Sequence, residues 1–525
     1  MSAHEHEVLA RPGAAQHTSV LFDGAEPDDA PSDPAVAQSL LEDLNLDQVI
    51  ESLVSGRDRS ELVALFSASL KERVTITYRQ RVMQDIERAE IAAGINRFVE
   101  SMRTMRQRRT FIGKLQYHQQ REFWLLQCAD AYCDAVRALA DGLTQAKPRS
   151  PGLQAVSGYL DRYVVSHEFV ELTSATSSLQ QRLGEVTYEL TINGNQVRVN
   201  RSDAGPDYTA EVEKLFERFR QGAVKDYRVR FPTLLEMGHV DSAILGYVAR
   251  LNPEVFADLD VFWQRHRGFA DDVVVRFDRE IQFYLAYQAY VASLKAAGLP
   301  FCYPDLVPDK DVEASETFDL ALASKLVAQG DTVVLNNWQL DGEERIFVVS
   351  GPNQGGKTTF ARTFGQLHHL ARLGCPVPGR HARLLLCDQI FTHFEKREDL
   401  DNMRGKLEDD LVRVHDILAK ATARSVIVMN ESFSSTSLAD ARFLGREVLW
   451  RMIDLDVIGV YVTFVDELAS LGPAIVSATS TVEEDDPARR TFKVERRPAD
   501  GLAYALAIAA KHGLTYRTLR ERLAR

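Results

Sequence analysis

The residues from Gly351 to Thr359, GPNQGGKTT, have the types and the spacing of a phosphate-binding loop. They satisfy the pattern G-x-x-x-x-G-K-[ST], in which glycines let consecutive backbone N–H groups point inward around phosphate oxygens. In this pattern Lys357 reaches the β- and γ-phosphates of a nucleotide, and the hydroxyl of Thr358 is a ligand of Mg²⁺. The sequence therefore predicts that ATP and Mg²⁺ bind here. The predicted nucleotide-binding residues are Gly351, Pro352, Asn353, Gln354, Gly355, Gly356, Lys357, Thr358 and Thr359.

Asn430 and Glu431 follow the apolar run SVIVM, where a nucleotide hydrolase carries a pair of acids. One acid of such a pair holds Mg²⁺, and the next orients the attacking water. Asn430 is neutral, so we expect it to contact the metal through a water and to attract the cation less strongly. Glu431 is the candidate catalytic base. The plain alternative is a solvated glutamate at the end of a strand.

The elements around the loop must be a strand before it and a helix after it. The run RIFVVS leads directly into Gly351, and Phe360, Phe364, Leu367 and Leu370 follow at helical spacing. This helix should stop at Gly374, because Pro376 cannot continue it. A loop between a strand and a helix N-terminus is the arrangement that phosphate binding needs.

The rest of the chain after residue 296 alternates short β-rich runs with helical segments. Strands that alternate with helices predict a parallel sheet with crossover helices, and we place a domain boundary near residue 296. The predicted domain thus covers residues 296–525. Its β-rich runs are RIFVVS, ARLLLCD, SVIVM, VIGVYVTF and TFKVERR.

The residues before 296 differ from the predicted domain in composition and in the spacing of their apolar residues. Residues 1–48 are rich in Ala, Pro, Gly and acids without an apolar period, which predicts a disordered acidic tail. Residues 49–295 have helical spacing, with one predicted β-hairpin over 184–201 whose turn contains Asn193-Gly194. A continuous helix from Asp271 to Ala297 would be about 40 Å long, which suits either a strut or a long core helix.

Composition restricts the class of protein further. The chain has 525 residues, 45% hydrophobic and 26% charged, so it is mostly folded, and its net charge of −13 argues against coating nucleic acid through bulk charge. The five cysteines form no C-x-x-C pair, and no signal peptide or membrane-spanning run is present, so we expect a cytoplasmic protein. The cysteines are Cys128, Cys133, Cys302, Cys375 and Cys387.

Four motifs in one order resemble the MutS family of DNA mismatch-repair ATPases, and the similarity covers roughly residues 50 to 525. The family's T-G-P-N-M-G-G-K-S-T is similar to SGPNQGGKTT, and its D-x-I-F-T-R-I is similar to CDQIFTHF from Cys387. Its L-L-D-E-x-G-R-G-T-S is similar to VMNESFSSTS, which contains Asn430 and Glu431. Its A-T-H-Y-H-E-L is met by the residues from Val462 to Leu468.

The resemblance implies a fold and an assembly. The fold is of the α plus α/β class: a helical core and lever region with a small β-hairpin, followed by a P-loop α/β ATPase domain of the ABC type. The C-terminal residues 502–525 resemble the family's closing helices, which contribute to dimerisation, so a homodimer is expected. Residues 1–48 are too few for the family's N-terminal mismatch-reading domain, so we expect that domain to be missing.

The chain also departs from the family pattern. Phe464 stands where the family has a histidine near the γ-phosphate, and DNMRGKLEDDL replaces a serine-containing motif that reaches the partner's nucleotide. Lys406 in that segment could supply charge to the γ-phosphate in trans or lie on a helix surface. The triplets at Phe98 and Phe169 match the letters of the family's F-x-E wedge but fall in helical core segments. Nucleotide binding is therefore better supported than fast hydrolysis.

The DNA-contacting residues are not identified by the sequence. The most basic stretches are RTMRQRR over 103–109, KDYRVRF over 225–231, and Arg198 with Arg201; they could track phosphates or be solvated faces. The favoured function is an ATP-dependent clamp on mismatched or branched DNA in mismatch repair or a related repair or recombination task, associated with the nucleoid when on DNA. The alternative is a nucleotide-gated scaffold that hydrolyses ATP slowly or not at all and binds a protein or RNA assembly.

Overall fold

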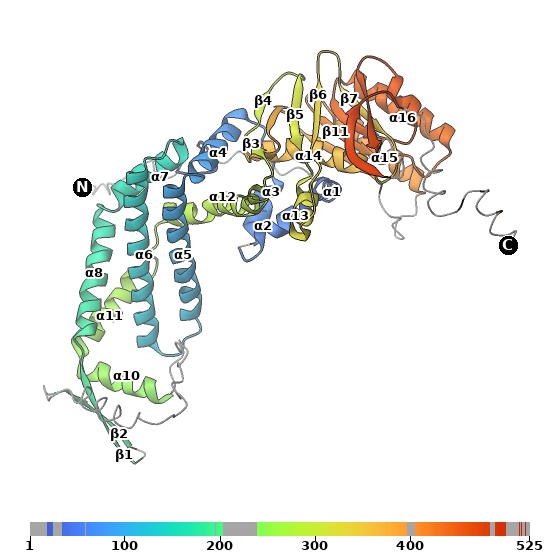
Figure 1. Ribbon diagram of the computed structural model, residues 1–525. Coiled ribbons are helices and arrows are strands. Elements are labelled where there is room, and N and C mark those ends of the chain that lie inside the picture. Colours follow the sequence, from blue (N-terminus) through green and yellow to red (C-terminus); the bar gives the residue numbers. More distant parts are fainter. Residues whose placement is uncertain are drawn as a thin grey trace, which may run out of the picture. The chain divides into compact units, whose positions relative to one another are not determined.

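The computed structural model describes residues 18–24, 34–57, 59–194, 196–202, 239–395, 405–483 and 489–499, with Leu514, Tyr516 and Arg520 (Figure 1). Contacts divide the chain into two compact units, and residues 279–525 belong to the second unit. Within the described ranges, no helix has both the length and the apolar character needed to cross a membrane. Apart from Leu514, Tyr516 and Arg520, the predicted C-terminal dimerisation helices lie outside the described residues, and so does KDYRVRF.

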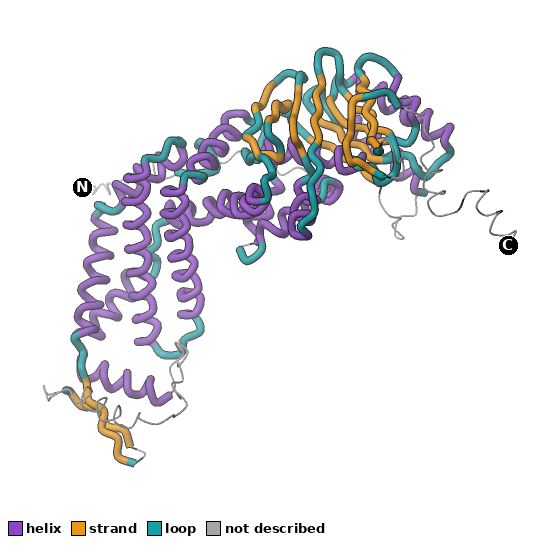
Figure 2. The backbone as a smooth tube through the Cα atoms, viewed as in Figure 1, coloured by secondary structure: helices purple, strands orange, loops and turns teal. Residues whose placement is uncertain are grey.

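The first unit, within Arg88–Pro148 and Gln154–Asp278, is built of helices and one hairpin (Figure 2). Helices α7 (Pro151–Tyr163) and α12 (Asp272–Ala296) each have residues in both units. Helix α12 confirms the long helix that the sequence predicts over 271–297. The expected domain boundary near residue 296 lies at the end of α12, whereas the contacts divide the chain within it, at Asp278. The helices are α5 (Ala89–Ile112), α6 (His118–Ala146), α7 (Pro151–Tyr163), α8 (His167–Gly184), α10 (His239–Leu251), α11 (Pro253–His266) and α12 (Asp272–Ala296).

Helices α5 and α6 pack against each other along one face of each. On α5 the buried residues recur every three or four positions, as in an amphipathic helix: Ile91, Ile95, Phe98, Met102 and Met105. Phe98 packs against Phe277 with ring centroids 5.7 Å apart, and Phe169 on α8 is fully buried. Both F-x-E triplets are therefore parts of the helical core, and neither aromatic ring is available to stack on a base.

The predicted β-hairpin is present as strands β1 (Tyr188–Asn193) and β2 (Gln196–Arg201). Asn193 pairs with Gln196, so Gly194 occupies the first position between the strands, with φ of 62°. The turn is thus shifted by one residue from the Asn193-Gly194 dipeptide that the sequence suggested. Gly194 adopts this left-handed conformation without a Cβ clash.

The second unit begins with helices that precede the sheet in the chain. They are α1 (Pro34–Asp43), α2 (Leu46–Val54), α3 (Arg59–Ser67) and α4 (Arg73–Ile86). Helix α1 and the start of α2 fall within residues 1–48, for which we expected a disordered tail. Leu41, Leu44 and Leu46 explain the difference, because all of them are buried in the second unit. Most of the remaining tail lies outside the described residues.

The second unit is organised around a six-stranded sheet with the order β10-β11-β12-β7-β13-β14. The first five strands in this order are parallel, and β14 pairs antiparallel with β13 at the edge. The parallel sheet predicted from the alternating pattern is therefore confirmed for RIFVVS, SVIVM and VIGVYVTF, whereas TFKVERR forms the antiparallel edge strand β14. The strands are β7 (Ile346–Ser350), β10 (Ile390–Phe394), β11 (Val426–Asn430), β12 (Ile458–Val462), β13 (Ile475–Val482) and β14 (Arg490–Arg496).

Helices cover both faces of this sheet. Ile346 and Val348 on β7 face a buried cluster that includes residues of α15 (Lys406–Lys420) and α16 (Leu438–Asp454), with the short helix η2 (Asp466–Ser470). Phe347, one residue along, packs instead on Phe360 of helix α14 (Lys357–Arg372), with ring centroids 5.7 Å apart. This alternation is the period of a strand buried on both sides.

Helix α14 is itself almost enclosed, because the N-terminal helices lie on it. The side chain of Gln366 donates a hydrogen bond to the carbonyl of Leu44 at 2.8 Å, and Nε2 of His369 donates to the carbonyl of Phe66 at 3.0 Å. Both histidines at positions 368 and 369 are buried, and burial lowers their pKa to about 4. The helix that follows the phosphate loop is therefore fixed in place from two sides.

Smaller sheets complete the second unit. A four-stranded sheet has the order β4-β9-β5-β6, and β3 pairs with β8. The predicted run ARLLLCD forms β9 in this sheet and not in the six-stranded one. Helix α13 (Leu320–Gln329) lies between β5 and β6 in the chain. The strands are β3 (Phe301–Cys302), β4 (Asp305–Val307), β5 (Val312–Thr317), β6 (Asn336–Leu340), β8 (Val377–Pro378) and β9 (His381–Leu385).

Candidate nucleotide-binding site

The loop from Gly351 to Gly356 lies between the end of β7 and the start of α14. Gly356 precedes the helix in a left-handed conformation, with φ of 98°, and no side chain caps the helix N-terminus. The first N–H groups of an α-helix have no partner within the helix. Here these donors, together with the positive end of the helix dipole, are at the position where a phosphate would bind.

Two of the glycines are required by the neighbouring strand. Gly351 has φ of 111°, and a Cβ there or at Gly355 would lie 2.6 Å from Oγ of Ser480 on β13. A larger side chain at either position would force the loop away from β13. Gln354 also has a positive φ, of 60°. The loop thus has a fixed backbone path that few other sequences could follow.

Lys357 is buried, and its ammonium group is directed at the loop. Nζ donates hydrogen bonds to the carbonyls of Gly351 at 3.0 Å and Pro352 at 3.2 Å, and to Oδ1 of Asn353 at 3.2 Å. Burial lowers the pKa of Lys357, and the negative charge of Glu431 partly offsets this effect. Phosphate oxygens would compete with these neutral acceptors for the same protons, and a charged acceptor forms the stronger bond.

Thr358 and Asn430 meet, as the metal-site prediction requires. Oγ1 of Thr358 donates a hydrogen bond to Oδ1 of Asn430 at 2.9 Å, although the two residues are 72 positions apart in the chain. Asn430 is the last residue of β11, and the order β11-β12-β7 puts its carboxyl end near that of β7. Both oxygens are ligands of the kind that Mg²⁺ accepts directly or through water.

Glu431 follows at the same edge of the sheet. Its backbone N–H donates to the carbonyl of Val462 at 3.0 Å, and its φ of 53° is in the left-handed region. Such a conformation is unfavourable for a residue with a Cβ, and it is common where a side chain must point to a defined place. Its negative charge raises the pKa of Lys357 and partly offsets the effect of burial.

The other motif residues have structural contacts. Asp388 accepts hydrogen bonds from the hydroxyls of Thr422 and Ser425, which fixes the segment that leads into β11. Thr392 donates to Asp43 at 2.7 Å, and Ser437 caps the N-terminus of α16. Phe464 is 48% exposed. The sequence motifs thus mark both the site and the elements that hold it.

Lys406 forms an ion pair within its own chain. Nζ contacts Oε1 of Glu395, which also accepts a hydrogen bond from Ser434 at 2.9 Å. The hydrogen bond from Lys406 is the main reason that the pKa of Glu395 is lowered. This pairing favours the helix-surface interpretation of Lys406, at the start of α15. Asp401 to Arg404 of the same motif lie outside the described residues.

The sequence reasoning missed a buried polar chain beside Glu431. Nδ1 of His393 lies 2.9 Å from Oγ of Ser432, and its Nε2 lies 3.3 Å from Oδ1 of Asp410 on α15. All of these side chains are buried. Ser432 thus links His393 on β10 to the turn at Glu431, whereas Nε2 of His393 lies beside Asp410 on α15 without a hydrogen bond. One available signal was that His393 stands at the position of an arginine in the family pattern.

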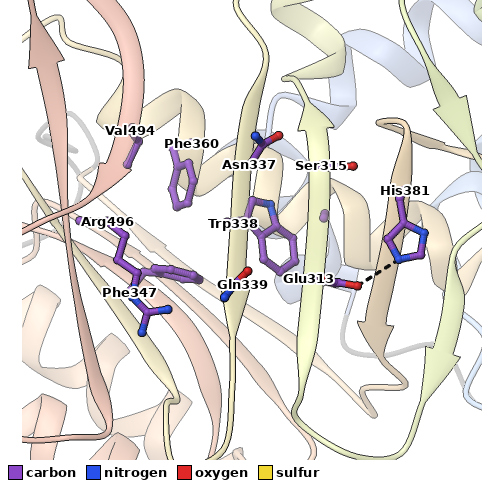
Figure 3. Close-up of a pocket in the computed structure, with 12 residues that line it drawn as sticks. Glu313, Ser315, Asn337, Trp338, Gln339, Phe347, Phe360, His381, Val494 and Arg496 are labelled. Atoms are coloured by element: carbon purple, nitrogen blue, oxygen red, sulfur yellow. Dashed lines mark hydrogen bonds and ion pairs between the residues drawn. The ribbon is translucent and has the colours of Figure 1, made fainter.

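A separate cavity of about 510 Å³ lies beside α14 in the second unit (Figure 3). Trp338, Phe347 and Phe360 line it, together with the ion pair between Glu313 and His381. None of the residues from 351 to 359 lines this cavity. This cavity is therefore separate from the loop that the sequence predicts to bind a nucleotide.

Arginines of the basic stretch on α5 have polar partners within the first unit. Arg106 forms an ion pair with Asp278, and Arg109 donates to the carbonyl of Arg267 at 3.1 Å. Arg201 likewise donates to the carbonyl of Leu251. These contacts hold helices and the hairpin together, which favours the structural interpretation of these arginines. Arg198 is exposed on β2.

Comparison with known proteins finds a family model that matches the part of the chain containing this loop. Residues 347–519 match the family model described as MutS domain V. The resemblance to the MutS family is therefore confirmed for this part of the chain, which contains the phosphate loop, Asn430 and Glu431.

Curated relatives are DNA mismatch repair proteins named MutS. The protein from Zymomonas mobilis is 35% identical over 129 residues, which cover 25% of this chain and 14% of the relative. The protein from Fervidobacterium nodosum is 28% identical over 193 residues, covering 35% and 23%, and that from Lactobacillus gasseri is 28% identical over 203 residues, covering 37% and 23%. The chain thus matches less than a quarter of the length of these relatives.

Proposed function

We propose that the second unit binds ATP with Mg²⁺ in the manner of a P-loop ATPase of the ABC type. The observation that carries this proposal is the hydrogen bond between Thr358 and Asn430, which joins the end of the phosphate loop to the end of β11. Lys357 would bind the β- and γ-phosphates, Thr358 and Asn430 would hold Mg²⁺, and Glu431 would orient the attacking water. Asn430 would act through a metal-bound water.

We further propose that the protein is a dimeric, DNA-binding switch of the MutS type that acts in the cytoplasm, on the nucleoid when bound to DNA. The domain V match and the names of the relatives support a role in mismatch repair or a related repair or recombination task. Nucleotide binding at two facing sites would open and close the helical parts of the dimer. Branched or bent DNA is the expected ligand, bound mainly through phosphates.

The second candidate is a nucleotide-gated scaffold for a protein or RNA assembly. Asn430 favours it, because a neutral amide attracts Mg²⁺ less than a carboxylate does. The contacts of Arg106, Arg109 and Arg201 also favour it, since these arginines already have partners within the chain.

ATP hydrolysis measured with and without DNA distinguishes the two candidates. We expect branched DNA to stimulate hydrolysis at least as well as a duplex with a single mispair, and we expect the stimulation to fall steeply as salt rises, because phosphate contacts supply the affinity. Fully paired duplex and single-stranded DNA are the controls. Equal rates with every DNA and without DNA would favour the scaffold, and a strong preference for the mispair would show a reading element that the sequence did not reveal.

Asn430→Asp tests how Mg²⁺ is held. A carboxylate also supplies the oxygen that Thr358 contacts, and it adds a negative charge beside the metal. We expect the Mg²⁺ concentration for half-maximal turnover to fall by about 3- to 10-fold, or about 1 kcal/mol, and turnover to rise. ATP affinity without Mg²⁺ is the control. A slower or unfolded variant would indicate that the amide N–H group satisfies an acceptor, and that the site is adapted to hold nucleotide.

A further inference from the structure

Three ionisable side chains of the first unit converge at one point between two helices. His118 and Glu122 are four residues apart at the start of α6, so they lie on one face of that helix. Asp260 reaches them from α11. Nε2 of His118 is 3.0 Å from Oε1 of Glu122 and 3.1 Å from Oδ1 of Asp260. One ligand atom from each residue falls within 4.8 Å of the other two.

Hydrogen bonding within the cluster leaves Oε1 of Glu122 without a partner. Nε2 of a neutral or charged imidazole carries at most one proton, and its geometry here fits a hydrogen bond with Asp260. Oε1 of Glu122 lies beside the same nitrogen but makes no hydrogen bond, and the Glu122 side chain is only 2% exposed. A buried carboxylate oxygen without a donor is costly. One imidazole therefore does not serve both carboxylates.

We propose that His118, Glu122 and Asp260 bind a divalent transition-metal ion, with water completing its coordination. One cation would satisfy the imidazole nitrogen and both carboxylate oxygens at once, which a single proton cannot do. An i, i+4 pair on one helix with a third ligand from a facing helix is a geometry that fits a small cation. The ion would tie α6 to α11. This proposal does not depend on nucleotide binding in the second unit.

The ligand set indicates which cations fit. An imidazole with two carboxylates suits Zn²⁺ or Mn²⁺, whereas Mg²⁺ and Ca²⁺ prefer oxygen ligands alone. His118 and Asp260 have side chains that are 52% and 48% exposed, so an ion can reach them from solvent. The competing occupant is a proton shared between the carboxylates, since burial raises the pKa of Glu122 to about 7.

Zinc titration of the full chain tests the site. Protein stripped with a chelator and free of nucleotide and Mg²⁺ is titrated with ZnCl₂ in a calorimeter. We expect His118→Ala to lose one equivalent of bound Zn²⁺, and Asp260→Asn to bind that equivalent at least about 10-fold more weakly. His381→Ala is the matched control, because His381 forms a 3.2 Å pair with Glu313 in the second unit and belongs to no cluster of three such ligands among the described residues. It should bind as the wild type does.

The same titration can overturn the proposal. Unchanged zinc stoichiometry and affinity in both His118→Ala and Asp260→Asn would do so, because any Zn²⁺ bound would then lie elsewhere. Glu122→Gln distinguishes the proton: if it raises thermal stability, and if all three variants bind Zn²⁺ as the wild type does, the cluster holds a proton and no metal. Circular dichroism confirms that each variant is folded, and Asp260→Asn, at a half-exposed position, keeps the test available if His118→Ala does not fold.

Discussion

Lys357→Ala should abolish ATP binding, with a loss of affinity of at least about 100-fold, or about 3 kcal/mol. The ammonium group is buried and lies 3.0–3.2 Å from acceptors on the phosphate loop, which places it where it would contact the β- and γ-phosphates. Its removal takes away a charge-assisted hydrogen bond to each phosphate that it reaches. Isothermal titration with ATP and Mg²⁺ measures the effect.

Lys325→Ala provides the control for Lys357→Ala. Lys325 is an exposed lysine on α13 in the same unit, and its loss removes the same charge from the chain. We expect its ATP affinity to equal that of the wild type. Unchanged ATP affinity in a folded Lys357→Ala protein would exclude the phosphate-loop assignment, even though the loop is similar in sequence to that of the MutS family.

The elements that carry the site could be predicted because each one is locally consistent. Strand β7 is a short apolar run that ends at the loop, and α14 shows apolar residues at helical spacing. Strands β11 and β12 are continuous apolar runs, as expected for a parallel sheet buried on both faces. The presence of these strands and the position of Asn430 at a strand end follow from these patterns.

Strand β13 shows why other parts could not be predicted. Its sequence IVSATSTV is rich in Ser and Thr, which also favour loops, and it gave no strand signal strong enough to separate it from a turn. Its place between β7 and β14 depends on pairing with residues more than 100 positions earlier in the chain. Ser480, which lies against Gly351 and Gly355, therefore remained hidden although it sets the path of the phosphate loop.

Long-range polar contacts were hidden for the same reason. Asp43, in a segment for which disorder was predicted, accepts a hydrogen bond from Thr392, and His393 is hydrogen-bonded to Ser432. No local pattern in the sequence predicts such pairs, because each partner, taken alone, is a polar residue of a common type.

Glu431→Gln should leave ATP bound but unhydrolysed, with turnover lowered on the order of 100-fold or more, the usual range for loss of a general base. The amide keeps the size of the side chain and can occupy the same left-handed backbone position, so binding should persist. Since each site of a MutS-type dimer would be completed by its partner, the variant should accumulate as a closed dimer. Light scattering with ATP and Mg²⁺ measures the dimer, and Glu447→Gln, at an exposed position on α16, is the control.

Each other outcome for Glu431→Gln identifies a different role for this residue. Loss of ATP binding would mean that the carboxylate stabilises the site through its charge beside Lys357, whose ammonium group it already favours. An unchanged rate would mean that Glu431 is a solvated residue at a strand end. A chain that stays monomeric with ATP and Mg²⁺ in both the wild type and the variant would contradict the dimeric switch. In that case slow turnover at a site with a neutral Asn430 favours the nucleotide-gated scaffold. ATP would then stabilise one conformation by binding, and its hydrolysis would not drive a conformational cycle.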